Sequence, residues 1–261
     1  MSQNEHTPLR VLVIVAHPDD IEFGAAGSIA RWTDEGAQVT FCIVTDGAAG
    51  SNDPNITPED LARIRREEQM AAAAVVGVHD VRFLGYRDGI LQPTLELRRE
   101  LTRLIREIRP QRVLCFDPTQ VFVQVPGFGD YINHPDHRAT AEAAVYAVFP
   151  SAETRPIFPE LLDEGLEPYH VPEVWFMLTT HEPNEFVDIT ATQERKMEAL
   201  RCHQSQIKGQ DLEFVRKWDA EAGKAAGYVY AESFWVMRFP VEQPRGEALA
   251  GAADEATMQE G

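Results

Sequence analysis

The chain has 261 residues, with 24 Lys and Arg against 42 Asp and Glu, which gives a formal net charge of −18. This acidic balance makes nucleic acid and anionic membranes poor partners, so we expect a neutral or cationic small molecule as substrate. The sequence contains no run of about 18 apolar residues and no apolar signal region near its start, so we expect a cytoplasmic protein without a membrane span. The three cysteines lie far apart and form no CxxC pair, so we expect no disulfide framework.

Apolar and amphipathic segments alternate through the first half of the chain. In order we expect a strand at Val11–Ala16, a helix at Gly24–Glu35, a strand at Val39–Thr45, a helix from Pro58 to about Val76, a strand at Val81–Leu84, a helix at Leu95–Ile108 and a strand at Val113–Phe116. Strand–helix–strand units joined by right-handed crossovers build a parallel sheet. The pattern therefore predicts a doubly wound α/β fold.

Prolines become frequent after about Phe149, and the regular alternation loosens. Further strands are expected at Val174–Leu178, Phe186–Ile189 and Tyr228–Met237, with a helix at Thr190–His203. We predict a single domain over residues 1–240, with a core at 9–150 and a region at 151–240 that extends the sheet and shapes the substrate pocket. Residues 241–261, rich in Gly, Ala and Glu, are predicted to form a disordered tail.

The most informative segment, AHPDD at Ala16–Asp20, directly follows the first predicted strand. In open parallel sheets, ligands bind beyond the carboxyl ends of the strands. His17 and Asp20 are three residues apart, so both can reach one ion, and Asp19 between them can face another atom of the same site. Capping of the next helix by Asp19 or Asp20 is the competing interpretation.

A second cluster, NHPDHR at Asn133–Arg138, follows the fourth predicted strand and precedes a predicted helix at Ala139–Val148. His134 and His137 therefore lie at the same edge of the sheet as the first cluster, although capping by Asp136 is again an alternative. Two histidines and one carboxylate that leave a position for water are typical of hydrolytic zinc sites. Such a ligand set also suits Fe²⁺.

Together these motifs resemble those of the LmbE-like, or PIG-L, family of N-acetylglucosamine de-N-acetylases, which carry AHPDD after the first strand and HPDH later. Further similarity lies in VTDGAAG at Val44–Gly50, ARIRREEQMAAAA at Ala62–Ala74, FLGYRDG at Phe83–Gly89 and the segment Phe186–Gln206. The similarity covers about residues 9–206 and implies a Rossmann-like three-layer fold with a mostly parallel sheet. Ile21 after AHPDD is the form that resembles bacillithiol-pathway and chitobiose deacetylases.

The resemblance assigns the central residues of the reaction. His17, Asp20 and His137 match the zinc ligands of the family, Asp19 matches its general base, and His134 matches the histidine that stabilises the oxyanion or protonates the leaving amine. Zinc lowers the pKa of bound water to about 7 and polarises a carbonyl. We expect Asp19 to take the proton of the water and a protonated His134 to donate to the oxyanion, with acetate and an amino sugar as products.

The resemblance also implies residues around this centre. Arg65 and Asp88 match positions that grip the sugar, and Asp136 is expected to orient His134. His181 lies between two predicted strands, where it can line the cleft. Relatives assemble as homo-oligomers, so we expect a trimer or a hexamer.

Three other functions remain open at this stage. A metal-dependent amidase acting on a non-sugar N-acyl amine would keep the metal site and change only the pocket. A catalytically inactive metal-binding module would keep the ligands alone. A nucleotide-binding Rossmann-like module is disfavoured, because His17–Asp20 replaces the glycine-rich phosphate loop with carboxylates that repel phosphate.

Overall fold

The computed structural model describes residues 7–125 and 129–240, so the tail predicted at 241–261 lies outside the described residues. A seven-stranded sheet has the order β3-β2-β1-β4-β7-β9-β8. Its strands are β1 Arg10–Val15, β2 Gln38–Thr45, β3 Asp80–Tyr86, β4 Arg112–Phe116, β7 Glu173–Met177, β8 Glu185–Asp188 and β9 Ala231–Arg238. Strands β1 to β4, β7 and β8 run in one direction, and only β9 runs in the opposite direction. The predicted α/β fold with a mostly parallel sheet is confirmed.

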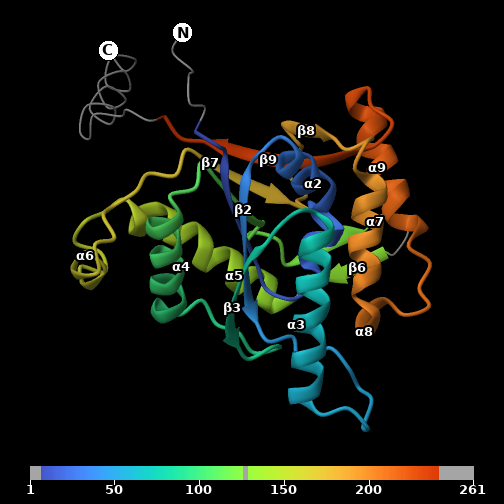
Figure 1. Ribbon diagram of the computed structural model, residues 1–261, viewed down its shortest axis with the longest axis horizontal. Helices are drawn as coiled ribbons and strands as arrows, with labels where there is room; N and C mark the ends of the chain where they lie inside the picture. Colours follow the sequence, from blue (N-terminus) through green and yellow to red (C-terminus); the bar gives the residue numbers. More distant parts are fainter. Residues whose placement is uncertain (1–6, 126–128, 241–261) are drawn as a thin grey trace, which may run out of the picture.

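Helices cover both faces of the sheet (Figure 1). One face carries α1 Asp20–Gly24, α2 Ala26–Asp34, α3 Pro58–Val75 and α7 Gln193–Cys202, and the other carries α4 Leu95–Ile108, α5 Pro135–Tyr146 and the π-helical turn η1 Ala147–Ala152. In β1, Val13 belongs to the buried apolar cluster that contains Trp32 on the first face, whereas Ile14 belongs to the cluster that contains Leu101 on the second. Burial on both faces explains why β1 is a continuous apolar run.

Three predicted helices differ in their bounds, and the one predicted at Thr190–His203 is the shorter α7, Gln193–Cys202. The segment predicted as one helix at Gly24–Glu35 is divided between α1 and α2 at Ala25, whose φ of −148° is not helical. A Cβ on Gly24 would lie 2.7 Å from the Met177 sulfur, so the glycine permits the close approach of β7. The helix predicted from Ala139 begins earlier, at Pro135, because proline is favoured at the first helical position.

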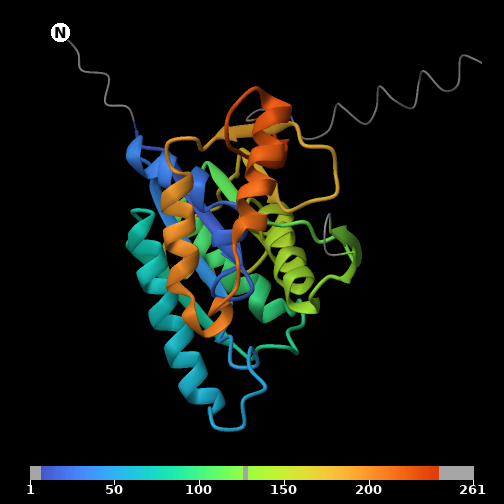
Figure 2. The same ribbon diagram turned by 90° about the vertical axis from the view of Figure 1, so that its right-hand side faces the viewer.

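Several elements lie outside the predicted set. Strands β5 Phe122–Val125 and β6 Gly129–Ile132 form an antiparallel hairpin between β4 and α5, which Figure 2 shows in green at one margin of the molecule. Helix α9, Glu213–Ala226, packs against β8 and β9. The short helices α6 Glu160–Asp163 and α8 Gln204–Ile207 were also not predicted. Within the described residues, no helix is both long enough and apolar enough to cross a membrane.

Candidate active site

The two sequence clusters meet at the carboxyl end of the sheet. His17 follows β1, and α5 begins with the second cluster after β4 and the hairpin. Strands β1 and β4 are neighbours, with β2 and β3 continuing on the far side of β1. The chain order reverses at this position, which is where ligands bind in open α/β sheets.

Three ligand groups face one another here. His137 Nε2 lies 3.2 Å from His17 Nδ1 and 3.1 Å from Asp20 Oδ1, and His17 Nδ1 lies 3.6 Å from Asp20 Oδ2. Ligands held about 2.0–2.1 Å from a tetrahedral zinc are separated from one another by roughly 3.3 Å. These spacings and the two-histidine, one-carboxylate chemistry fit a zinc ion. The side chain of His134 is also close enough to belong to a metal-binding set with His17 and His137.

The remaining ring nitrogens of the two histidines have protein partners. His17 Nε2 lies 3.1 Å from Asp88 Oδ1 and 3.4 Å from Asp136 Oδ2, which leaves Nδ1 directed at the other ligands. His137 Nδ1 lies 3.2 Å from Asn133 Oδ1, which leaves Nε2 directed at His17 and Asp20, where a metal can bind. Carboxylates and amides in this position orient a ligand histidine and raise its basicity.

The carboxylates around His17 give the site a strong preference for positive charge. Burial would lower the pKa of His17, but hydrogen bonds to Asp136, Asp20 and Asp88 raise it to about 12. Burial alone would raise the pKa of these carboxyls, whereas their contacts with the histidines lower it. Because a histidine must be neutral to bind a metal, a metal ion displaces this proton.

Asp19 has a strained backbone and a perturbed carboxyl group. Its φ of 100° lies in the left-handed region, which residues with a Cβ rarely adopt. Its side chain keeps 16% of its surface exposed, and Oδ2 accepts a hydrogen bond of 3.1 Å from Arg65. Burial raises the pKa of Asp19 to about 6, although the charge of Arg65 opposes the shift. A carboxylate with a pKa close to neutrality is suited to act as a general base.

His134 caps the N-terminus of α5, and this position determines its tautomer. Its Nδ1 accepts a hydrogen bond of 3.2 Å from the backbone N–H of Asp136, so the neutral ring carries its proton on Nε2. Burial and the charges of His17 and His137 lower the pKa of His134. These observations favour a neutral ring that donates through Nε2–H, whereas a protonated His134 stays a prediction.

The guanidinium of Arg65 is enclosed by protein groups. Arg65 is only 4% exposed, and it donates to Pro18 O at 2.6 Å and to Gly47 O at 3.0 Å. A Cβ on Gly47 or Gly50 would approach the guanidinium to 3.0 or 2.6 Å, so the glycines let the VTDGAAG segment close over it. These contacts favour a role in holding Asp19, whereas the predicted contact with the sugar stays a prediction.

Asp88 and Asp136 also have contacts that the sequence did not indicate. Both carboxylates face His17, and Asp88 Oδ2 accepts the backbone N–H of Ala49 at 2.9 Å. Asp136 touches His134 through its backbone N–H rather than through its carboxylate. The geometry supports a role for both carboxylates in orienting His17, and the sugar contact predicted for Asp88 stays a prediction.

A cleft of about 790 Å³ extends from the metal cluster, between the β5–β6 hairpin and α9. Its aromatic lining residues are Phe23, Phe116, Tyr131, Phe214 and Trp218. The Phe116 ring stacks on His137 with the ring centroids 4.3 Å apart, which joins the cleft wall to the metal cluster. The volume and the mainly apolar walls suit a small-molecule ligand.

This cleft is also lined by buried charged groups that were not predicted from the sequence. Lys196 Nζ lies 2.7 Å from Asp219 Oδ1 and 2.9 Å from Glu232 Oε1. Asp117, directly after β4, lies 3.5 Å from His181 Nε2, so His181 reaches the cleft through this carboxylate. Asp117 could have been identified from the sequence, because it directly follows a predicted strand. The Lys196 cluster had no such signal, because its residues come from α7, α9 and β9.

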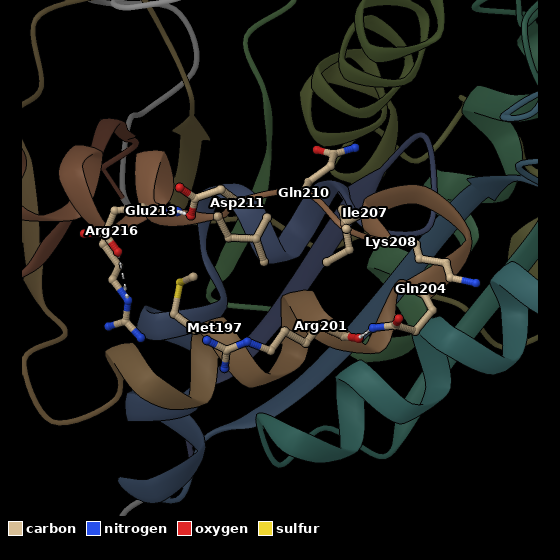
Figure 3. A pocket seen from close by; sticks show the side chains of 11 residues that line it. Met197, Arg201, Gln204, Ile207, Lys208, Gln210, Asp211, Glu213 and Arg216 are labelled. Atoms are coloured by element: carbon tan, nitrogen blue, oxygen red, sulfur yellow. Dashed lines mark hydrogen bonds and ion pairs between the residues drawn. The ribbon is translucent and has the colours of Figure 1, made fainter.

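A second pocket, of about 350 Å³, lies beside α7 and α8 (Figure 3). Met197, Arg201 and Gln204 lie along one wall. Arg216 at its rim is paired with Glu194 at 2.6 Å. None of the predicted site residues lines this pocket, so the candidate active site is the cleft beside the metal cluster.

The fold and the site together define an α/β protein with a candidate metal centre of the hydrolytic type. The family model described as PIG-L, GlcNAc-PI de-N-acetylase, matches residues 12–148, and the chain belongs to this family. The resemblance found in the motifs is thereby confirmed.

Named relatives agree with this placement. The chain is 35% identical over 231 residues to diacetylchitobiose deacetylase of Thermococcus kodakarensis, covering 85% of this chain and 81% of that protein. It is 31% identical to a probable N-acetyl-α-D-glucosaminyl L-malate deacetylase 2 of Bacillus anthracis, covering 88% of this chain and 95% of that protein. Among solved structures, N,N'-diacetylchitobiose deacetylase from Pyrococcus horikoshii matches with a TM-score of 0.79 at 35% identity, covering 88% of this chain and 84% of that one.

Proposed function

We propose that the chain is a zinc-dependent hydrolase that removes the N-acetyl group from an N-acetylglucosamine-containing small molecule, releasing acetate and a free amino sugar. The observation that carries the proposal is the mutual approach of His17 Nδ1, His137 Nε2 and the Asp20 carboxylate. The deacetylase names of the relatives support the reaction type. We propose zinc as the metal because this ligand set is typical of hydrolytic zinc sites. Fe²⁺ is the alternative, because the same ligands can also bind it.

The surrounding residues supply the proton transfers of amide hydrolysis. A zinc ion held by the three ligands would lower the pKa of water and polarise the acetyl carbonyl. Asp19 accepts the proton of the attacking water and then delivers it to the nitrogen of the departing amine. The Nε2–H of neutral His134 donates to the carbonyl oxygen as negative charge develops there. Such a donor contributes about 3 kcal/mol in comparable oxyanion sites.

The charges along the cleft favour a substrate without acidic groups. Lys196 is the only Lys or Arg among the described residues that line the cleft, and its ammonium is buried between Asp219 and Glu232. Asp117 and Asp130 add further carboxylates to the walls. A malate group would bring two more carboxylates into this cleft without an unpaired cation to meet them. We therefore propose an uncharged N-acetylated sugar such as N,N'-diacetylchitobiose.

Acetate release from a small substrate panel tests this proposal. The panel contains N-acetylglucosamine, N,N'-diacetylchitobiose, the L-malate conjugate of N-acetylglucosamine and a non-sugar N-acetyl amine. We expect kcat/KM for N,N'-diacetylchitobiose to exceed that for the malate conjugate by at least roughly tenfold, because like charges in contact cost several kcal/mol. Release from the non-sugar amine alone would favour the amidase, and no release from any compound would favour the inactive module.

Two further properties stay predictions. Assembly as a trimer or hexamer is measured by light scattering of the purified protein. A cytoplasmic location is tested by fractionation of cells that express the chain.

A further inference from the structure

A line of buried polar side chains runs from Asp19 into the core, and the proton transfers above do not use it. Gln69 on α3, Glu22 on α1 and His203 after α7 are each 0% exposed. The N–H of Asp19 donates to Gln69 Oε1 at 3.0 Å, and Gln69 Nε2 donates to Glu22 Oε1 at 2.8 Å. Glu22 Oε2 then lies 3.3 Å from His203 Nε2. Burying a polar group without a partner is costly, and the two hydrogen bonds of Gln69 provide partners for the Asp19 N–H and for Glu22 Oε1.

The first member of this line holds the strained residue of the site. Asp19 has φ 100° and ψ −23°, and such backbone conformations persist only where surrounding contacts enforce them. Helix α3 supplies two of these contacts, since Arg65 binds the carboxylate of Asp19 while Gln69 binds its backbone N–H. The two side chains are four residues apart and therefore lie on the same face of the helix.

The chemistry of this position calls for a carboxamide. The side chain must accept a hydrogen bond from the N–H of Asp19 and also donate one to the carboxylate of Glu22. A glutamine amide does both in a single orientation, whereas a glutamate has no donor when ionised and a leucine has neither group. The amide of Gln69 therefore cannot rotate without losing both of its hydrogen bonds, and Glu22 Oε2 faces His203 as an ion-pair contact.

We propose that Gln69 is a positioning residue for the deacetylation, supported by Glu22 and His203. It holds the backbone of Asp19 in the left-handed conformation that points the carboxylate toward the reacting water. The inference rests on the proposed role of Asp19 as the general base. Gln69 itself touches neither the substrate nor a metal ligand, so its effect is on turnover.

Gln69→Leu tests the inference in the zinc-loaded protein. We expect kcat for acetate release to fall roughly 10- to 100-fold, as for other residues that orient a reacting group, with KM and zinc content unchanged. Gln193→Leu is the matched control. Gln193 is a buried glutamine on α7, bonded to Arg216 and Asp219 and absent from the cleft lining. Its loss should lower Tm and leave kcat unchanged.

The outcomes separate this inference from the proposed function. If Gln69→Leu does not fold, Gln69→Asn keeps the amide but retracts it by one methylene, and the same fall in kcat is expected. A folded, zinc-loaded Gln69 variant with wild-type kcat overturns the positioning role, as does an equal loss in Gln193→Leu. Wild-type activity in Asp19→Asn overturns the role of Asp19 and the inference with it. An inactive Asp19→Asn beside a fully active Gln69 variant overturns the inference alone.

Discussion

Asp136→Ala tests the contacts that hold His17, and the structure indicates the size of the effect. The carboxylate of Asp136 is fully buried, and it accepts the backbone N–H groups of Gly89 at 2.7 Å and Leu91 at 3.1 Å. The substitution leaves both donors without an acceptor, at about 1–3 kcal/mol each, so the free energy of unfolding should fall by roughly 2–6 kcal/mol. For a chain of this size, Tm should fall by roughly 5–20 °C.

The same substitution should weaken zinc binding. His17 Nε2 keeps Asp88 but loses Asp136, and loss of a residue that orients a metal ligand lowers affinity about 10- to 100-fold. Thermal unfolding of the metal-free protein and zinc competition against a chromophoric chelator measure the two effects. Asp163→Ala, an exposed carboxylate on α6, is the control. Wild-type Tm and zinc affinity in Asp136→Ala would refute the assigned contacts.

Further predictions follow from the buried charges. Asp19→Asn should keep its zinc, as metal analysis would show, and lower kcat about 10²- to 10⁴-fold. In the wild type, kcat should decline as the pH falls through the pKa of Asp19. This pKa is about 6 in the metal-free protein and is lower beside a metal cation. A kcat that does not change at acid pH would contradict this prediction. The pKa of His17 rises from 6.5 unfolded to about 12 folded, so the metal-free protein should lose stability as the pH rises above 6.5. Melting curves at neutral and alkaline pH should show this loss only without zinc, because zinc replaces the proton. Lys196→Met should cost about 3–5 kcal/mol in chemical denaturation, because Asp219 and Glu232 lose their buried cation.

The core elements with a strong apolar periodicity were the most predictable from the sequence. Leu95–Ile108 has the predicted bounds, because its apolar spacing is strongly helical and Thr94 and Pro110 delimit it. The approach of His17 to His137 was also predictable, since both clusters follow strands of one parallel sheet. Periodicity and strand ends therefore define both the core and the edge where the site lies.

Contacts between distant segments were not predictable in the same way. The β5–β6 hairpin has two short strands, and runs of this length cannot be told from a loop by alternation alone. Asp88 and Asp136 resemble turn and capping residues in the sequence, and only the folded chain brings both carboxylates to His17. The protonation of His134 likewise depends on its capping bond and on neighbouring charges, which no local pattern encodes.

Zinc titration of the chelated protein, with acetate release from N,N'-diacetylchitobiose as the readout, tests the central claim most directly. Activity should be absent without metal, rise in proportion to added zinc and saturate at one zinc per chain. His137→Ala should show no such rise at the same zinc concentrations, because it lacks one of the three ligands. Full acetate release by the metal-free protein, or an unchanged titration of His137→Ala, would contradict a zinc-dependent reaction at this site.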